Sequence, residues 1–218
     1  MSDEPPAGRP AITGYPVQLV VAGRRCVVVG AGRIGARKIA ALLEAGADVH
    51  VVAPNVGDEV RSWAEAGRLV VSEREFEPAD LDDAWLATTA TGVPAVDHAV
   101  FEAGEARRVW VNSADDPANC SFILTSVVRR GDLVVTIGTG GRSPALAAWL
   151  RGRLAEELGP EYATLLDVLS EAREELRAAG RSSEGPDWQS AIDSGMLDAI
   201  RAGRVDEAKE ILRACLWS

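Results

Sequence analysis

The chain has 218 residues, 47% hydrophobic and 26% charged, enough for one ordinary core with a smaller unit attached. Its formal net charge of −10 argues against general nucleic-acid binding, which needs a broad basic surface, so an acidic ligand must meet a local basic cluster. No secretory signal or membrane-spanning stretch is visible, which predicts a soluble, cytoplasmic protein with no membrane partner. Three cysteines without metal-ligand spacing predict neither a disulfide framework nor a metal site.

The first third of the chain predicts a tail, two strands and a helix. Residues 1–14 mix Pro, Gly and charge and predict a loose tail. A short lead-in strand is expected over 15–21, followed by a turn and a buried strand that ends at Gly30. A glycine turn then leads directly into a helix over 36–45.

The glycine turn predicts a site for a dinucleotide pyrophosphate. Gly30 would permit the tight turn, Gly32 would let the backbone approach the phosphates, and Gly35 would let the helix pack closely on the strand. The helix N-terminus would supply amide donors and the positive end of its dipole. The alternative is a glycine turn kept for packing alone.

The pattern then alternates between strands and helices up to residue 116. Strands are expected over 49–52, 69–72, 84–89 and 109–112, with helices over 56–66 and 94–107. This alternation predicts an α/β fold, a Rossmann-type doubly wound parallel sheet covering residues 15–116.

In such a sheet ligands bind beyond the carboxyl ends of the strands, so residues there are candidate cofactor contacts. Thr88, Thr89 and Asn112 stand at two of these ends. At the end of the second strand the usual ribose-binding acid is absent, and Asn55 or backbone groups must make those contacts. The acidic-residue rule therefore does not decide between NAD and NADP.

Two adjacent carboxylates, Asp115 and Asp116, follow the fifth strand. One could act as a base, because desolvation in a cleft raises the pKa of a carboxyl group. The equally weighted alternative is an Asx turn closed by Pro117.

The alternation of predicted strands and helices ends at Pro117. Residues 121–137 predict two antiparallel strands joined by a charged glycine turn, suited either to packing under the sheet or to pairing with another subunit. The loop Thr139-Gly140-Gly141-Arg142-Ser143 then precedes a helix; it suits an anionic group or is a capped αβ loop. A small helical domain is expected at the C-terminus, with helices over 145–158, 162–179, 196–202 and 205–216.

These segments together resemble one family, the dehydrogenase/ferrochelatase module of siroheme synthases. The resemblance is carried by Tyr15-Pro16-Val17, the Gly30 turn with Ala36-Arg37-Lys38, Asn112 with Asp115, Ser121-Phe122, and Thr139 to Ala147. It implies oxidation of precorrin-2 to sirohydrochlorin with NAD and, in bifunctional members, insertion of ferrous iron as a substrate to give siroheme. Dehydrogenase activity alone, or a non-catalytic protein that senses NAD or binds a tetrapyrrole, are the alternatives.

The resemblance also assigns roles by position. It implies that Asp115 is the catalytic aspartate and that Arg33, Ile34, Pro54 and Asn55 contact the cofactor. Thr139 matches a hydroxyl beside the tetrapyrrole, which makes the loop 139–143 the candidate substrate site. The resemblance further implies a homodimer in which residues 117–150 interlock with the partner, followed by a helical domain over 151–218. Gly138, Thr125 and Asp97 depart from the family's usual residues.

Overall fold

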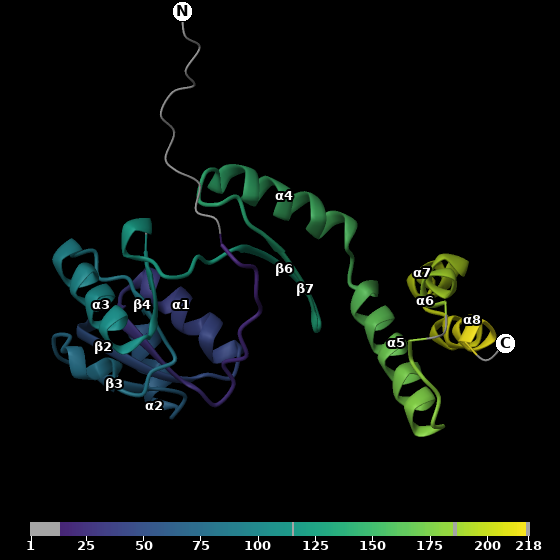
Figure 1. Cartoon of the computed structure of the whole chain (residues 1–218), viewed down its shortest axis with the longest axis horizontal. Helices are drawn as coiled ribbons and strands as arrows, with labels where there is room; N and C mark the ends of the chain where they lie inside the picture. Colours follow the sequence, from purple (N-terminus) through teal and green to yellow (C-terminus); the bar gives the residue numbers. More distant parts are fainter. Residues whose placement is uncertain (1–13, 115, 185–186, 217–218) are drawn as a thin grey trace, which may run out of the picture. The chain divides into compact units, whose positions relative to one another are not determined.

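The computed structural model describes residues 14–114, 116–184 and 187–216 and has two compact units, with the boundary after Leu124. The first unit contains a five-stranded sheet in the order β3-β2-β1-β4-β5, and every neighbouring pair is parallel. The strands are β1 (Arg25–Ala31), β2 (Asp48–Val56), β3 (Val70–Ser72), β4 (Leu86–Thr89) and β5 (Trp110–Ser113) (Figure 1). The predicted Rossmann-type parallel sheet is confirmed.

Helices cover both faces of this sheet. Alternate residues of β1 point to opposite faces: Val28 packs in one core cluster with α1 (Arg33–Glu44) and α2 (Asp58–Glu65). Val27 packs in the other cluster with α3 (Pro94–Arg107). A short 3₁₀ turn, η1 (Pro78–Leu81), precedes β4. The sheet is therefore buried on both sides, which explains its near-continuous runs of valine.

The outer edge of β5 is covered by the chain that follows it. After a 3₁₀ turn, η2 (Pro117–Asn119), Cys120 forms an antiparallel bridge with Asn112. The Ser121 amide then donates to the Val111 carbonyl at 2.8 Å, and the Ser121 hydroxyl accepts from the Val111 amide at 2.7 Å. This returning segment satisfies backbone groups that an edge strand would otherwise leave open.

The lead-in strand expected over residues 15–21 is wrong. Residues 14–21 contain no strand, and Tyr15 and Val20 are 89% and 74% exposed. Of the apolar residues in this stretch, Val21 is buried and joins the core under α1. The alternation of apolar residues was present, but within the described part of the chain no strand pairs with this segment, and an unpaired strand is not stable in water.

The second unit begins with the predicted antiparallel pair. β6 (Ser126–Arg130) and β7 (Leu133–Ile137) pair from Ser126 with Ile137 to Arg130 with Leu133. Gly131 stands in the turn between them with a φ of +56°. Helix α4 (Pro144–Glu157) follows and packs against the hairpin (Figure 1).

The rest of this unit is a helical cluster. Helix α5 (Glu161–Ala178) buries Leu165, Val168, Ala172 and Leu176 in one apolar core with the last helices. These are α6 (Trp188–Ala191), the π-helical segment η3 (Ile192–Met196), α7 (Leu197–Arg201) and α8 (Val205–Leu216). Helices α6 to α8 gather beside α5 (Figure 1). The small C-terminal helical domain is confirmed, although α6 and η3 were not expected from the sequence. Within the described residues, no helix is long and apolar enough to cross a membrane.

Candidate dinucleotide site at the carboxyl edge of the sheet

The three glycines of the motif, Gly30 in β1, Gly32 at the N-cap of α1 and Gly35 in α1, have different surroundings. Gly30 has a φ of +103°, and a Cβ there would lie 2.6 Å from the Ala90 carbonyl oxygen. A Cβ on Gly35 would overlap the carbonyl of Gly30. Gly32, in contrast, has no neighbouring atom within 4 Å of an added Cβ and has an ordinary negative φ. Packing explains Gly30 and Gly35, whereas nothing packs against Gly32, and the approach of a ligand to its backbone stays a prediction.

The N-terminus of α1 suits an anionic group. Gly32 is the N-cap, no side chain caps this end, and the first turn holds no acidic residue. The first amides of a helix have no partner within the helix and carry the positive end of its dipole. Arg33 and Ile34 lie exposed in this first turn, and their contact with a cofactor stays a prediction. The residues present therefore fit a dinucleotide pyrophosphate.

The glycine turn and the N-terminus of α1 together form what we call the cradle. Beside the cradle, the end of β2 departs from regular parallel pairing. Val29 pairs with Val52 and Ala31 pairs with Val56, so Ala53, Pro54 and Asn55 stand opposite Gly30 alone. Pro54 and Asn55 are exposed there. The first carboxylates that follow, Asp58 and Glu59, lie in the first turn of α2. The strand end itself presents an amide side chain where a ribose-binding acid is usual.

Thr88 and Thr89 end β4 and face opposite sides of the sheet. The Thr89 hydroxyl donates to Asp97 on α3, and the same carboxylate oxygen accepts the Thr91 hydroxyl at 2.7 Å. Asp97 thus holds the loop after β4, whose Ala90 carbonyl lies against Gly30. The Thr88 hydroxyl is buried and has no hydrogen-bond partner among the described residues. An unpaired buried hydroxyl is costly, which leaves Thr88 a candidate for a ligand contact.

Asn112, at the end of β5, is 7% exposed and its side chain has protein partners. Its Oδ1 accepts from Lys38 Nζ of α1 at 2.7 Å, and its Nδ2 donates to the Phe122 carbonyl at 3.1 Å. A cofactor contact of Asn112 stays a prediction. Beside it, burial raises the pKa of the Cys120 thiol above its usual value, and the nearby ammonium of Lys38 opposes that rise. Sequence reasoning missed the contact of Lys38, although Lys38 lies in the Ala36-Arg37-Lys38 motif.

Of the two adjacent carboxylates after β5, the structure describes Asp116. Asp115, the predicted base, lies outside the described residues. Asp116 is the N-cap of η2: its carboxylate accepts from the Ala118 amide at 3.2 Å and from Asn119 Nδ2 at 2.7 Å. The Asx turn closed by Pro117 therefore exists, and Asp116 makes it.

In the second unit, the loop 139–143 is held by its own side chains. Gly140 and Gly141 have φ values of +59° and +74°, and the Thr139 hydroxyl accepts from the Ser143 amide at 3.3 Å. The Ser143 hydroxyl accepts from the Leu146 amide at 3.2 Å and so caps α4. This is the capped αβ loop that the sequence offered as one alternative. Arg142 is exposed in it, and a substrate role for the loop stays a prediction.

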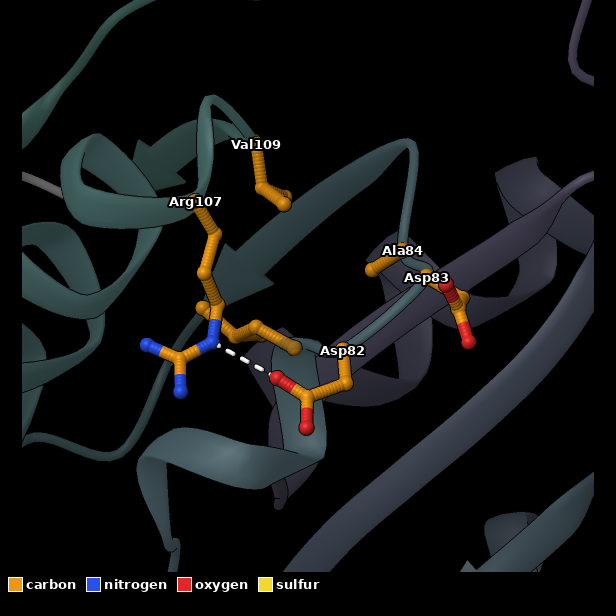
Figure 2. A pocket seen from close by; sticks show the side chains of 6 residues that line it. Asp82, Asp83, Ala84, Arg107 and Val109 are labelled. Atoms are coloured by element: carbon orange, nitrogen blue, oxygen red, sulfur yellow. Dashed lines mark hydrogen bonds and ion pairs between the residues drawn. The ribbon is translucent and has the colours of Figure 1, made fainter.

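A separate hollow of about 530 Å³ lies at the opposite, amino edge of the sheet, before β4 and β5. Figure 2 shows Arg107 reaching across it to Asp82, with the Nε to Oδ1 hydrogen bond at 2.8 Å. Asp83 and Ala84 form its other side. The hollow is lined by residues from neither the glycine turn nor the carboxyl ends of the strands, and it belongs to no site predicted from the sequence.

The parallel sheet, the open glycine cradle and the uncapped helix define a Rossmann-type dinucleotide-binding protein. A family model described as putative NAD(P)-binding matches residues 17–126, and the chain belongs to this family. The predicted nicotinamide cofactor is confirmed at the level of an NAD(P)-binding domain.

Proteins with the name siroheme synthase are similar to this chain in sequence. Siroheme synthase from Nitrosococcus oceani is 32% identical over 203 residues, which cover 92% of this chain and 43% of that protein. Siroheme synthase 2 from Cronobacter sakazakii is 44% identical over 139 residues, covering 64% of this chain and 30% of that protein. The chain therefore spans less than half the length of these relatives.

A solved structure extends the comparison to the whole fold. SirC, a precorrin-2 dehydrogenase, matches with a TM-score of 0.73 and 26% identity, over 92% of this chain and 100% of that one. The expected resemblance to the N-terminal module of siroheme synthases is confirmed.

Proposed function

We propose that this protein oxidises precorrin-2 to sirohydrochlorin with NAD as the hydride acceptor. One observation carries the proposal: the chain covers the whole of a solved precorrin-2 dehydrogenase and has the same fold. The geometry of the site supports it, because Gly32 and the uncapped α1 leave room and donors for a pyrophosphate. No part of the proposal requires a nucleic acid or a membrane.

The reaction removes one hydride and one proton from the macrocycle and forms one new carbon–carbon double bond. When bound at the N-terminus of α1, NAD would supply the hydride acceptor. The chain must hold the dinucleotide at Gly32 and at the first amides of α1, and must take the proton. We assign the proton to the Asp115 carboxylate, because the chain places it two residues after the end of β5.

Precorrin-2 carries many carboxylates, which need a local basic cluster in a chain of net charge −10. The loop Thr139–Ser143 with Arg142 is the proposed substrate-binding segment. Arg142 is exposed and has a guanidinium suited to bidentate contact with a carboxylate. The guanidinium of Arg130 instead binds backbone carbonyls at the end of α4. Its Nη2 donates to the Ala155 carbonyl at 2.6 Å, and its Nε donates to the Leu158 carbonyl at 2.5 Å.

The relatives' name, siroheme synthase, favours a second step. In that step ferrous iron, as a substrate, replaces two pyrrole N–H protons of sirohydrochlorin, and two protons are released. Asp115 is the proposed acceptor for these protons too. Dehydrogenase activity alone remains the alternative, as does a non-catalytic protein that binds NAD or a tetrapyrrole.

We further propose a homodimer through residues 117–150 and a cytoplasmic location. The support within this segment is apolar surface on α4, where Leu146 and Trp149 are 48% and 58% exposed. Large apolar side chains left open on one helix are typical of a surface that meets a partner.

The test incubates the protein with precorrin-2 and NAD without oxygen and follows NADH absorbance. Asp115→Asn is expected to lower turnover by about 100-fold or more while NADH affinity changes less than about twofold. The matched control is Asp116→Asn, which keeps an oxygen for the Asx turn and should stay active. Absence of NADH from intact substrate would overturn the proposal. Ferrous iron added afterwards separates the alternatives: a siroheme spectrum supports the second step, and unchanged sirohydrochlorin leaves a dehydrogenase.

A further inference from the structure

Lys38 connects the cofactor helix to a strand that lies two places away in the sheet. It lies on α1, whose N-terminus forms the cradle, and its ammonium donates to Asn112 of β5 at 2.7 Å. β4 lies between β1 and β5 in the sheet. The side chain of Lys38 therefore joins α1, which is proposed to hold the hydride acceptor, to β5, which the proposed proton acceptor follows in the sequence.

The register of the strands shows what lies beneath this bridge. Val28 pairs with Thr88, and Thr88 pairs with Asn112, so these three side chains form one row on one face of the sheet. Val28 packs under α1, which identifies the face. Thr88, in the middle of the row, is the residue whose buried hydroxyl has no partner among the described residues. Lys38 thus donates to the Asn112 end of a row that also contains Thr88, at the carboxyl end of the sheet.

The side chain of Asn112 also contacts the segment Cys120–Phe122, which returns along β5. Its Nδ2 donates to the Phe122 carbonyl and contacts Cys120 Sγ at 3.6 Å. The Ser113 amide donates to the same sulfur at 3.2 Å. These bonds hold the end of β5 against the returning segment Cys120–Phe122. Lys38 supplies the charged hydrogen bond from α1 to the end of β5.

We propose that Lys38 is a positioning residue for the oxidation: it holds the carboxyl end of β5, which the proposed base follows in the sequence, at a set distance from α1, the helix proposed to bind the dinucleotide. The inference rests on the proposed function. Hydride and proton leave the same substrate, so the two groups that accept them must be held at a fixed distance from each other. A shift of about 1 Å in that distance can cost about 100-fold in rate. A charged hydrogen bond from a half-buried lysine to a buried amide holds this distance better than a neutral hydrogen bond does.

The variants are Lys38→Met, which keeps the apolar stem, and Lys38→Arg, which keeps the donor and the charge. The matched control is Arg37→Met, which removes the same charge from the exposed neighbouring position of α1. The measurements are the kcat and KM for precorrin-2, the Kd for NADH by fluorescence, and hydrogen exchange of residues 111–122.

For Lys38→Met we expect kcat to fall by about 10- to 100-fold, with KM and the Kd for NADH changed less than about threefold. Exchange within 111–122 should become faster, and Lys38→Arg should recover most of the lost rate. Arg37→Met should match the wild type in every measurement. A normal kcat in Lys38→Met overturns the inference and leaves the proposed function standing, as does a loss that Arg37→Met shares. A wild-type protein that does not oxidise precorrin-2 overturns the proposed function and this role of Lys38 with it.

Discussion

Gly35 lies so close to Gly30 that a Cβ on Gly35 would overlap the Gly30 carbonyl. The contact joins the first turn of α1 to the end of β1 and sets how closely the helix approaches the sheet. The neighbouring Gly32 has no such contact. The same motif therefore contains two glycines that packing explains and one, Gly32, that packing does not explain and for which we predict ligand approach.

Gly35→Ala and Gly32→Ala should separate these two roles. Gly35→Ala must move α1 away from β1, and we expect it to lower the free energy of unfolding by about 1–3 kcal/mol. Gly32→Ala should cost less than about 1 kcal/mol, because its backbone suits alanine, but should weaken NADH binding at least about tenfold by filling the phosphate approach. Urea unfolding and NADH fluorescence measure the two effects. Equal losses of stability in both variants would contradict this division.

Asp97 should be a stability residue of the loop that borders the cradle. It is 7% exposed and accepts hydrogen bonds from the hydroxyls of Thr89 and Thr91. Asp97→Ala leaves these donors without a partner and should lower the free energy of unfolding by about 2–4 kcal/mol. Asp97→Asn keeps one acceptor oxygen and should cost less than half as much. Urea unfolding of the two variants measures the difference, and equal costs would show that the acceptor does not matter.

Asn55 should determine how the site treats the 2′ position of the adenosine ribose. The carboxyl end of β2 holds Asn55 exposed and has no acidic residue, so no carboxylate at that strand end repels a 2′-phosphate. We expect the Kd values for NADH and NADPH to differ by less than about tenfold. Asn55→Asp should weaken NADPH by about tenfold or more and leave NADH within about threefold. Asn55→Ala is the control, because it removes the amide without adding charge, and discrimination in Asn55→Ala equal to that in Asn55→Asp would refute the electrostatic reason.

Asp80 should give the first unit a pH-dependent contribution to stability. Burial alone would raise the pKa of its carboxyl, but hydrogen bonds from Arg74 and from the Glu77 amide outweigh burial and hold the pKa below its usual value. Arg74 Nη1 and Nη2 contact the two oxygens at 2.9 and 2.5 Å. A carboxyl with a lowered folded pKa stabilises above the unfolded pKa of about 3.9 and loses that contribution as pH falls through the folded value.

The measurement compares the wild type with Asp80→Asn by urea unfolding between pH 3 and 7. The variant should be less stable by about 1–2 kcal/mol from pH 5 to 7, and the gap should narrow below about pH 4. Arg74→Gln should reproduce the loss above pH 5. A gap that stays constant down to pH 3 would mean that the ionised carboxyl contributes nothing.

The sequence predicted the parts of the fold that depend on neighbours along the chain. The bounds of α3, Pro94–Arg107, match the expectation, because a proline at the start and a loss of apolar period at the end mark the helix locally. The antiparallel pair β6 and β7 was equally visible, since a glycine turn stands between two apolar runs too close for a crossover helix. The lead-in strand over 15–21 was wrong for the opposite reason: pairing is not a local property.

Within the candidate site, the sequence by itself determined the strand, the glycine turn and the helix that form the cradle, because a 2-residue period, a 3.6-residue period and glycine all act over a few residues. Only the tertiary structure decided that Gly32 faces open space, that Asp116 caps η2, and that Lys38 reaches Asn112, 74 positions away in the chain. Such contacts depend on strand order and register, and these are set by how whole faces of the sheet are buried beneath the helices.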